Sequence, residues 1–370
     1  MSEQFVSASA RGSDIDALAD SLVAAIGPDS KASLGFLYVT EALAVGLDPL
    51  LLRLRQHLDV QDWIGTVGLG ICCTGSEIYD EPAAVILLTQ LQGYQTFSIP
   101  DTTAGMGETL AAISSQALAP GLGIIHGNPA NANFGQAFET LCSTLGDTFF
   151  VGGLGSTNSM APLVLNRATD APISGVLFED SSGMVVSHSQ GCTPIEGSHV
   201  ITRCQQNLVI ELDHRPALEV LKEDIGEVLA RDLEQIGGYI FVGFPVPHSD
   251  THDYLVRNII AIDPEKSIIA VGELVEEGQA MMFCRRDGTS AVEDMQRMLR
   301  EISSRLSSPP RGALYVSCVA RGRHQFGKDS AELKIIQQQL GDVPLAGFFA
   351  NGEILHNRLY GYTGVLTLFS

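Results

Sequence analysis

GALYVSCVARGRHQFGKDS, at Gly312–Ser330, opens the stretch that decides the fold. Its first part, ALYVSCV at Ala313–Val319, is an apolar run typical of a buried strand. A polar turn follows, and Ser330–Leu340 then has the apolar spacing of a helix. A second apolar run, LAGFF, leads into a glycine turn within Leu345–Ile354. The order predicts a strand–helix–strand unit that ends in a turn.

The same order of elements recurs twice earlier in the chain. Leu122–Val151 reads GIIHG as a strand, QAFETLCSTL as a helix and TFFV as a second strand. A fainter copy covers Leu34–Ile78, where TGSEI around Glu77 resembles NGEI around Glu353. A repeat of about 45 residues is also typical of solenoids, but here the copies are separated by unlike segments. We therefore expect duplication inside one globular fold, the alternative being that any two such units look alike.

The fold class follows from this alternation of helices and strands. Aligning the copies puts Gly152 near Gly347, and hairpin patterns are inserted between the units. The sequence predicts an α/β (mixed α+β) protein of two domains, with mixed parallel and antiparallel sheets flanked by helices. We place a lead-in helix in 1–30, an N-terminal domain in 31–213 and a C-terminal domain in 214–370.

Composition narrows the classes of function. The 370 residues carry a formal charge of −21, which argues against a nucleic-acid partner or an anionic membrane surface. The first residues lack the apolar region of a secretory signal, and no apolar run is long enough to span a membrane. Seven irregularly spaced cysteines fit a reducing compartment better than a disulfide framework. We expect a cytoplasmic protein.

Many short elements then fall in the order of a known family. In the N-terminal part they are Gly152-Gly153, Gly175–Phe178, Gly183, Gly191–Ile195, Val200–Thr202 and Glu211–Val220. In the C-terminal part they are Tyr254–Arg257, Arg286-Asp287, Gly312–Leu314, Cys318, Arg321-Gly322, Phe326-Gly327, Glu332, Gly347–Phe349 and Gly352–Ile354. With these elements the chain resembles FIST proteins, named for F-box and intracellular signal transduction, with both an N-terminal and a C-terminal FIST domain.

The resemblance implies a sensory module that binds a small ligand, with amino acids as the leading class. Family members are often fused or linked to histidine kinases, cyclic-di-nucleotide enzymes or chemotaxis receptors. Some look like haem proteins that sense nitric oxide, and a eukaryotic branch serves ubiquitin ligases. Because this chain shows no kinase, GGDEF or F-box segment, an output would act through a separate partner.

Two charged residues at strand ends are the leading ligand contacts. Arg321 could hold a carboxylate through its planar guanidinium, or it could pair internally with Glu332. Glu353 could accept an ammonium group, or it could bond turn amides. Together they suit a zwitterion, and on this reading Arg321→Ala abolishes binding without unfolding the protein. The other candidate contacts are Asn351, Gly352, Cys318, Phe349, Tyr254, Arg257 and Glu77, where Arg257 is as well explained by an internal ion pair.

Metal, haem and catalytic alternatives have less support in the sequence. The adjacent Cys72 and Cys73 point to opposite faces of a strand, so they cannot easily share a metal. His248 and His252 lie in an acidic loop, where zinc binding is an alternative to a solvated loop. Haem would need an axial ligand, for which the candidates are His126 and His188. No nucleophile elbow, Walker loop or dinucleotide motif is present, so we expect neither an enzyme nor a required cofactor. A pure protein-interaction scaffold remains a third alternative.

Overall fold

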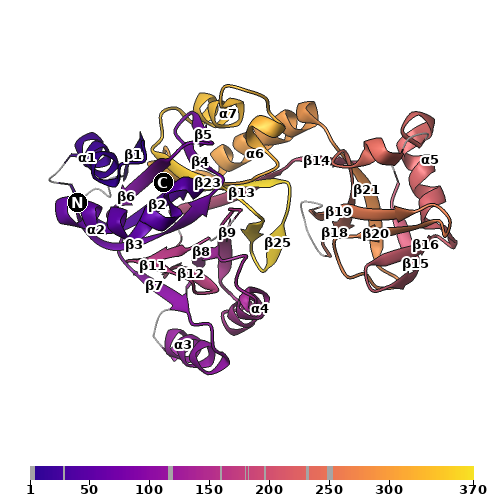
Figure 1. Cartoon of the computed structure of the whole chain (residues 1–370), viewed down its shortest axis with the longest axis horizontal. Helices are drawn as coiled ribbons and strands as arrows, with labels where there is room; N and C mark the ends of the chain where they lie inside the picture. Colours follow the sequence, from indigo (N-terminus) through magenta and orange to yellow (C-terminus); the bar gives the residue numbers. More distant parts are fainter. Residues whose placement is uncertain are drawn as a thin grey trace. The chain divides into compact units, whose positions relative to one another are not determined.

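The computed structural model describes residues 5–27, 30–115, 120–158, 161–179, 181, 183–195, 197–230, 233–247 and 253–370. It forms two compact units (Figure 1). Unit 1 comprises Met1–Ser189, Met295–Leu359 and Thr363–Ser370, and unit 2 comprises Gln190–Asp294 and Tyr360–Tyr362.

The described residues of unit 1 form three six-stranded sheets, which we number I to III. Sheet I has the order β1 (Phe5–Arg11), β6 (Ala83–Thr89), β2 (Lys31–Thr40), β3 (Asp59–Gly68), β10 (Leu163–Leu165), β11 (Ala168–Thr169). Sheet II has the order β7 (Tyr94–Ile99), β12 (Ile173–Phe178), β8 (Leu122–Gly127), β9 (Phe149–Leu154), β24 (Glu353–Leu355), β25 (Arg358–Tyr360). Sheet III has the order β13 (Met184–Gln190), β26 (Thr363–Phe369), β22 (Gly312–Cys318), β23 (Leu345–Ala350), β4 (Gly70–Cys73), β5 (Ser76–Tyr79).

Each sheet is built around one of the predicted repeats. The parallel pairs are β2 with β3, β8 with β9 and β22 with β23. The connecting helices are α2 (Leu47–His57, after the 3-10 turn η1 at Glu41–Gly46), α4 (Phe134–Thr144) and α7 (Ala331–Leu340, after η3 at Gly322–His324). The internal duplication and the mixed sheets predicted from the sequence are therefore confirmed, with three copies.

The repeats exchange their next strands in a cycle. After β3 the chain enters sheet III, where β4 pairs with β23. After β23 it enters sheet II, where β24 pairs with β9. After β9 it reaches sheet I, where β10 pairs with β3. Each sheet is thus completed by a strand from another repeat, so no repeat is complete alone.

A glycine is required at the same place in each parallel pair. Gly65 lies opposite Leu37, and a Cβ on it would stand 1.7 Å from the Leu37 carbonyl oxygen. Gly152 and Gly347 have the corresponding distance of 1.8 Å to the carbonyl oxygens of Ile125 and Tyr315. Only glycine allows the two backbones to approach this closely. The glycine match between Gly152 and Gly347 was visible in the sequence.

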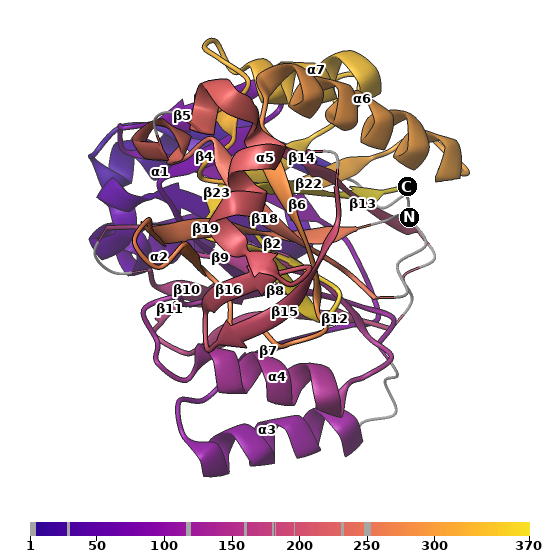
Figure 2. The same cartoon turned by 90° about the vertical axis from the view of Figure 1, so that its right-hand side faces the viewer.

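Aromatic side chains close the centre where the repeats meet. The Tyr38 hydroxyl lies 3.1 Å from Nε2 of His126. Both rings pack against Phe348, with centroid distances of 5.1 Å from Tyr38 and 5.8 Å from His126. All three side chains are fully buried. Three more helices contribute to unit 1: α1 (Ile15–Ile26), α3 (Thr103–Ser115) and the part of α6 (Gly288–Arg305) from Met295 onward. Helix α3 lies beside α4, and α6 lies beside α7 (Figures 1 and 2). The core over sheet III includes Met295, Met298, Leu299 and Ile302 of α6.

Unit 2 is a closed antiparallel sheet. Its order is β14 (Cys192–Pro194), β21 (Ala280–Arg286), β15 (His199–Gln205), β16 (Leu208–Leu212), β20 (Ile268–Val271), β19 (Tyr254–Asp263), β18 (Ile240–Pro245), and β18 pairs again with β21. The short β17 (Arg215–Pro216) adds to β16, α5 (Ala217–Ala230) follows it, and η2 covers Leu233–Ile236. Apolar residues of α5 pack on those of the sheet, as with Leu221 and Phe283.

The compact units are not consecutive along the chain. The chain leaves unit 1 after Ser189 and re-enters it at Met295, so unit 2 is an insertion. The sequence-based domains 31–213 and 214–370 each cover one continuous stretch of chain, unlike the compact units. The boundary between these two domains stays a prediction. Within the described residues, no helix combines the length and the apolar character needed to cross a membrane.

The first prediction concerns the required glycines. Gly347→Ala should lower the free energy of unfolding by about 3 kcal/mol or more, because its methyl group would collide with a backbone carbonyl. Gly135→Ala is the control, since nothing lies within 4 Å of a Cβ there, and in the helix α4 it should raise stability by up to about 1 kcal/mol. Urea denaturation followed by circular dichroism measures both. Equal effects of the two substitutions would refute the close-approach explanation.

Candidate functional site

Arg321 lies just after β22 and is fully buried. Its Nε donates to Oε1 of Glu332 at 2.8 Å, and its Nη2 donates to the Ser189 hydroxyl at 2.8 Å. The Tyr315 hydroxyl is 3.4 Å from Nη2, and the guanidinium carbon lies 4.9 Å from the centre of the Phe326 ring. The guanidinium predicted to hold a ligand is therefore already surrounded by internal partners.

Glu332, on α7, is also fully buried and accepts several hydrogen bonds. Its Oε1 accepts from the hydroxyls of Tyr315 at 2.6 Å and Ser317 at 3.0 Å, in addition to Arg321. Its Oε2 accepts from the Gly322 amide at 2.7 Å. Burial alone would lower the pKa of Arg321, but the charges of Glu332 and Tyr315 and the hydrogen bonds with them together outweigh burial and raise the pKa. Glu332 thus occupies the place predicted for a ligand carboxylate, which is the internal pairing that the sequence left open.

Glu353 lies on β24 and is fully buried as well. Its Oε2 accepts from the amide and the hydroxyl of Thr363, at 3.0 and 2.7 Å. Its Oε1 has no hydrogen-bond partner among the described residues. Burial raises the pKa of Glu353 to about 8, although Thr363, Arg321 and Cys318 act to lower it. Glu353 is therefore mostly a neutral acid at pH 7, which does not favour the predicted contact with an ammonium group.

The repeats show that Glu353 is an exception. Glu353 lies opposite Gly153, the residue after the required glycine of sheet II. The corresponding positions in sheets III and I are Ile71, opposite Phe348, and Leu163, opposite Thr66. Ile71 and Leu163 are fully buried aliphatic residues. The fold is satisfied by an aliphatic side chain at this position, so the acid at 353 needs another explanation.

Glu77 has a different role from Glu353. It lies on β5, its Oε2 accepts from the Tyr79 hydroxyl at 3.0 Å, and its amide donates to the Ser330 hydroxyl at 2.9 Å. Burial, followed by repulsion from Glu332, raises the pKa of Glu77 to about 7, while backbone amides at the start of α7 lower it. A carboxylate is favourable at a helix N-terminus. The structural counterpart of Glu353 in this repeat is Ile71, so the pairing of Glu77 with Glu353 was wrong in register.

The other predicted contacts of unit 1 are placed as follows. Phe349 is fully buried and packs on Tyr79 with a centroid distance of 4.7 Å. Asn351 is exposed, and Gly352 is buried with a φ of +133° at the turn between β23 and β24. Cys318, at the end of β22, is nearly buried. These residues surround the same strand ends as Arg321 and Glu353.

Tyr254 and Arg257 belong to β19 of unit 2. The Tyr254 hydroxyl donates to the Cys192 carbonyl oxygen. Arg257 donates from Nε to Oε2 of Glu273 at 2.8 Å, which is the internal ion pair that the sequence offered as an explanation. Both residues therefore have partners within unit 2.

The histidines proposed for haem lie in different surroundings. His126 is fully buried, and burial lowers its pKa to about 3, so the imidazole is neutral. His188 is half-buried on β13. Neither histidine lines the groove between α5 and β21 or the two cavities beside α7 and after α6. His248 and His252 lie outside the described residues. Within the described residues, no group of three or more His, Cys, Asp or Glu side chains could hold a metal.

Comparison with known proteins gives the family. Models of two domains match the chain, the FIST N domain over residues 33–215 and the FIST C domain over residues 217–356. The chain belongs to the FIST family. FIST domains are sensory domains of signal transduction. The resemblance inferred from the sequence is confirmed.

Mycobacterial proteins are similar over most of this FIST chain. Uncharacterized protein Rv0628c of Mycobacterium tuberculosis (strain ATCC 25618 / H37Rv) is 31% identical over 334 residues, which cover 86% of each chain. Uncharacterized protein Mb0898c of Mycobacterium bovis (strain ATCC BAA-935 / AF2122/97) is 30% identical over 328 residues, which cover 85% of this chain and 84% of that protein. The similarity extends over both FIST domains.

The second prediction compares two neighbouring arginines. Arg321→Ala should cost about 3–5 kcal/mol of stability, because it leaves Glu332 buried without its cation. This changes the expectation that Arg321→Ala leaves the fold intact. Arg323 forms an exposed pair with Asp80, so Arg323→Ala should cost less than about 1 kcal/mol.

The Arg321→Met/Glu332→Leu double variant should recover part of the loss, since it removes both buried charges but leaves Tyr315, Ser317 and the Gly322 amide without their acceptor. Urea denaturation of the three variants measures the effects. A double variant that is no more stable than Arg321→Ala would argue against the uncompensated charge as the cause.

The third prediction uses the pKa of Glu353. Its folded pKa of about 8 exceeds the ordinary 4.5, so the folded state binds this proton more tightly. The stability that the proton contributes is present at low pH and is lost as pH rises through the folded pKa. Between pH 5 and 8 the loss is on the order of 1 kcal/mol per pH unit.

Glu353→Leu, which introduces the residue found at the corresponding position 163 of sheet I, lacks this loss. The stability of Glu353→Leu relative to wild type should therefore increase with pH, and other titrating groups cancel in the difference. Urea denaturation at pH 5, 6, 7 and 8 gives the two curves. Parallel curves would show that Glu353 is ionised throughout.

Proposed function

We propose that this FIST protein is a non-enzymatic sensory module that binds a small zwitterion, with an amino acid as the leading ligand. The bound state acts on a separate partner, a histidine kinase or a cyclic-di-nucleotide enzyme in trans. The ligand class is supported by charges of both signs on one groove of unit 2. The partner class rests on the family.

The groove lies between α5 and the end of β21. It has a volume of about 530 Å³ and is lined by Pro194, Ile195, Glu223, Asp224 and Arg285. Pro194 and Ile195 supply an apolar wall beside the charged groups. The volume falls within the range of small-ligand sites.

Arg285 is the natural partner for a ligand carboxylate. Within the described residues its guanidinium makes no hydrogen bond, and the nearest carboxylate oxygen, on Asp287, is 3.9 Å away. Its side chain is 52% exposed, so it can reach a ligand without displacing an internal partner. This distinguishes Arg285 from Arg321, whose donors are already used. A guanidinium binds a carboxylate through two parallel hydrogen bonds.

Asp224 is held in place on the opposite side of the groove. Its Oδ2 lies 2.9 Å from Nε2 of His199, and Nδ1 of His199 lies 2.7 Å from Oδ2 of Asp213. Two carboxylates can both accept from one imidazole only when both ring nitrogens carry hydrogen. Burial lowers the pKa of His199, but the hydrogen bonds with Asp224 and Asp213 outweigh it and raise the pKa. The described hydrogen bonds leave Oδ1 of Asp224 for a ligand ammonium group.

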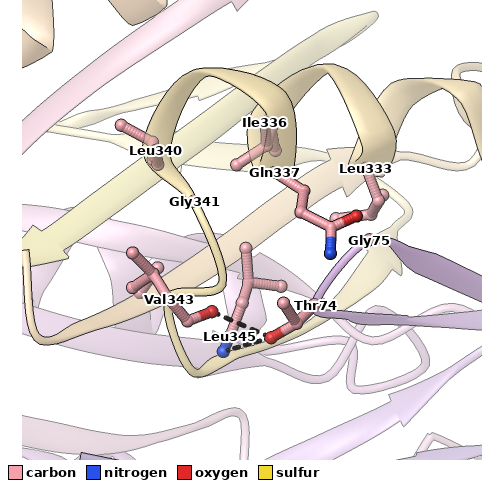
Figure 3. Close-up of a pocket in the computed structure, with 10 residues that line it drawn as sticks. Thr74, Gly75, Leu333, Ile336, Gln337, Leu340, Gly341, Val343 and Leu345 are labelled. Carbon is pink, nitrogen blue, oxygen red and sulfur yellow. Dashed lines mark hydrogen bonds between the residues drawn. The ribbon is translucent and has the colours of Figure 1, made fainter.

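Two further cavities, both in unit 1, fit a zwitterion less well. One lies between the Thr74-Gly75 turn and α7 (Figure 3). There the Thr74 hydroxyl donates a hydrogen bond to the Val343 carbonyl oxygen and accepts one from the Leu345 amide. Its volume of about 10 Å³ holds no more than about one water molecule. The other, about 370 Å³, follows α6 and is lined by uncharged residues such as Leu306, Pro309 and Gln339. Neither offers a pair of opposite charges.

The fourth prediction tests the groove with an amino-acid panel. Arg285→Ala should weaken binding of the best amino acid by roughly tenfold or more, because a charge-assisted hydrogen bond is lost. The amide of the same amino acid lacks the carboxylate, so Arg285→Ala should not change its affinity. Isothermal titration calorimetry, after a thermal-shift screen of the panel, measures both ligands.

Arg203→Ala is the matched control. Arg203 is an exposed arginine of unit 2 that pairs with Glu211 and does not line the groove. Wild-type protein that binds no member of the panel would refute the ligand class. Equal affinities of the Arg285→Ala and Arg203→Ala variants would refute the groove as the site.

A further inference from the structure

The buried cluster of unit 1 touches the places where the chain passes between the two units. The passages fall after Ser189, before Met295, after Leu359 and before Thr363. Arg321 donates to Ser189 at 2.8 Å, and its Nη2 lies 4.0 Å from the Met295 sulfur. Thr363 donates both its amide and its hydroxyl to Glu353. At three of the four passages, the last residue on the side of unit 1 is held by Arg321 or Glu353.

Glu353 is the member of this cluster that the fold does not require. Ile71 and Leu163 fill the corresponding positions of the other two sheets. A buried acid with an unpartnered oxygen is costly unless it is neutral, and Oε1 of Glu353 is such an oxygen. The carboxyl group of Glu353 is therefore most stable in its protonated form, at a position where an aliphatic residue would complete the core.

We propose that Glu353 is a proton-binding site, and that loss of its proton to solvent draws the Arg321 guanidinium away from Ser189 towards Glu353. With Glu353 neutral, Arg321 and Glu332 form one balanced ion pair. With Glu353 ionised, one guanidinium faces two carboxylates and is shared between them. The hydrogen bond to Ser189 is then the contact most easily given up, because its acceptor is uncharged.

The groups around Glu353 permit this shift. Cys318 comes from β22, Arg321 from the segment after β22, and Thr363 from β26. Opposite Glu353, β9 contributes Gly153, which has no side chain. Among the residues that the structure describes, the formal charge that acts on Glu353 is that of Arg321, and its attraction grows when the proton leaves. Burial of Glu353 raises its pKa to about 8, which puts the event within reach of ordinary changes in pH.

Gly364, next to Thr363, leaves the space for the Tyr315 hydroxyl and lets β26 come close to Arg321. A Cβ on Gly364 would lie 3.2 Å from Nη2 of Arg321 and 2.1 Å from the Tyr315 hydroxyl. The guanidinium therefore already lies against β26, beside the residue that binds Glu353.

This proton site is independent of ligand sensing and of the groove of unit 2. It gives the protein a second input, in which the proton at Glu353 determines how firmly Ser189 and Thr363 are held. A protein that binds no zwitterion could still show it.

Hydrogen–deuterium exchange of the full chain at pH 6.5 and 8.5, corrected for intrinsic exchange rates, tests the proposal. Peptides that cover 184–191 and 360–366 should lose protection at pH 8.5 in the wild-type protein. If the fraction of molecules with ionised Glu353 rises about tenfold, exchange should become roughly tenfold faster. A peptide from β2, in sheet I, should keep its protection. Glu353→Gln, which stays neutral, and Glu353→Leu should show no such change with pH.

Either of two results overturns the proposal. One is equal protection of the wild-type peptides at both pH values. The other is the same loss of protection in Glu353→Gln or Glu353→Leu, which would assign the change to another group. Because the two variants carry different side chains, misfolding of one leaves the other as the test.

Discussion

The guanidinium of Arg321 and the carboxylate of Glu332 are both withdrawn from water, and the surroundings must offset the cost of removing two charges from solvent. Tyr315, Ser317 and the Gly322 amide donate to the carboxylate, and Ser189 accepts from the guanidinium. These contacts fix α7 against β22 and tie β13 to the same point. The order of sheet III at its strand ends depends on this pair, because removing either partner leaves the other charge buried.

The internal repeat makes departures from the common pattern informative. Gly65, Gly152 and Gly347 occur at one position because each parallel pair brings a carbonyl oxygen against that residue. Glu353 departs from the pattern set by Ile71 and Leu163, and it does so beside Arg321. A polar group that replaces an aliphatic one in a fully buried repeat position is hard to explain by stability, which is why we connect it with regulation.

The sequence was sufficient for the family and for the repeat, because strand–helix–strand units have a local pattern. It could not reveal the exchange of strands between sheets, since β4 and β23 pair across about 270 residues without a shared motif. For the same reason the resemblance of TGSEI to NGEI misled, because similar short sequences do not establish register. Glu77 lies on β5, beside the first turn of α7. Arg321 was correctly placed at a strand end, but its burial with Glu332 depends on tertiary packing. The sequence did not point to the groove that Arg285 and Asp224 line, because these residues come from β21 and α5 and belong to no motif.

A direct test of the central claim, that this FIST protein senses a small zwitterion, is mass spectrometry of what the freshly purified protein releases on denaturation, together with its absorption spectrum. The account predicts a colourless protein that releases a molecule with both a carboxylate and an amine, and an Arg285→Ala variant that releases much less of it. A Soret band, or a released molecule that lacks either charge, would contradict the account.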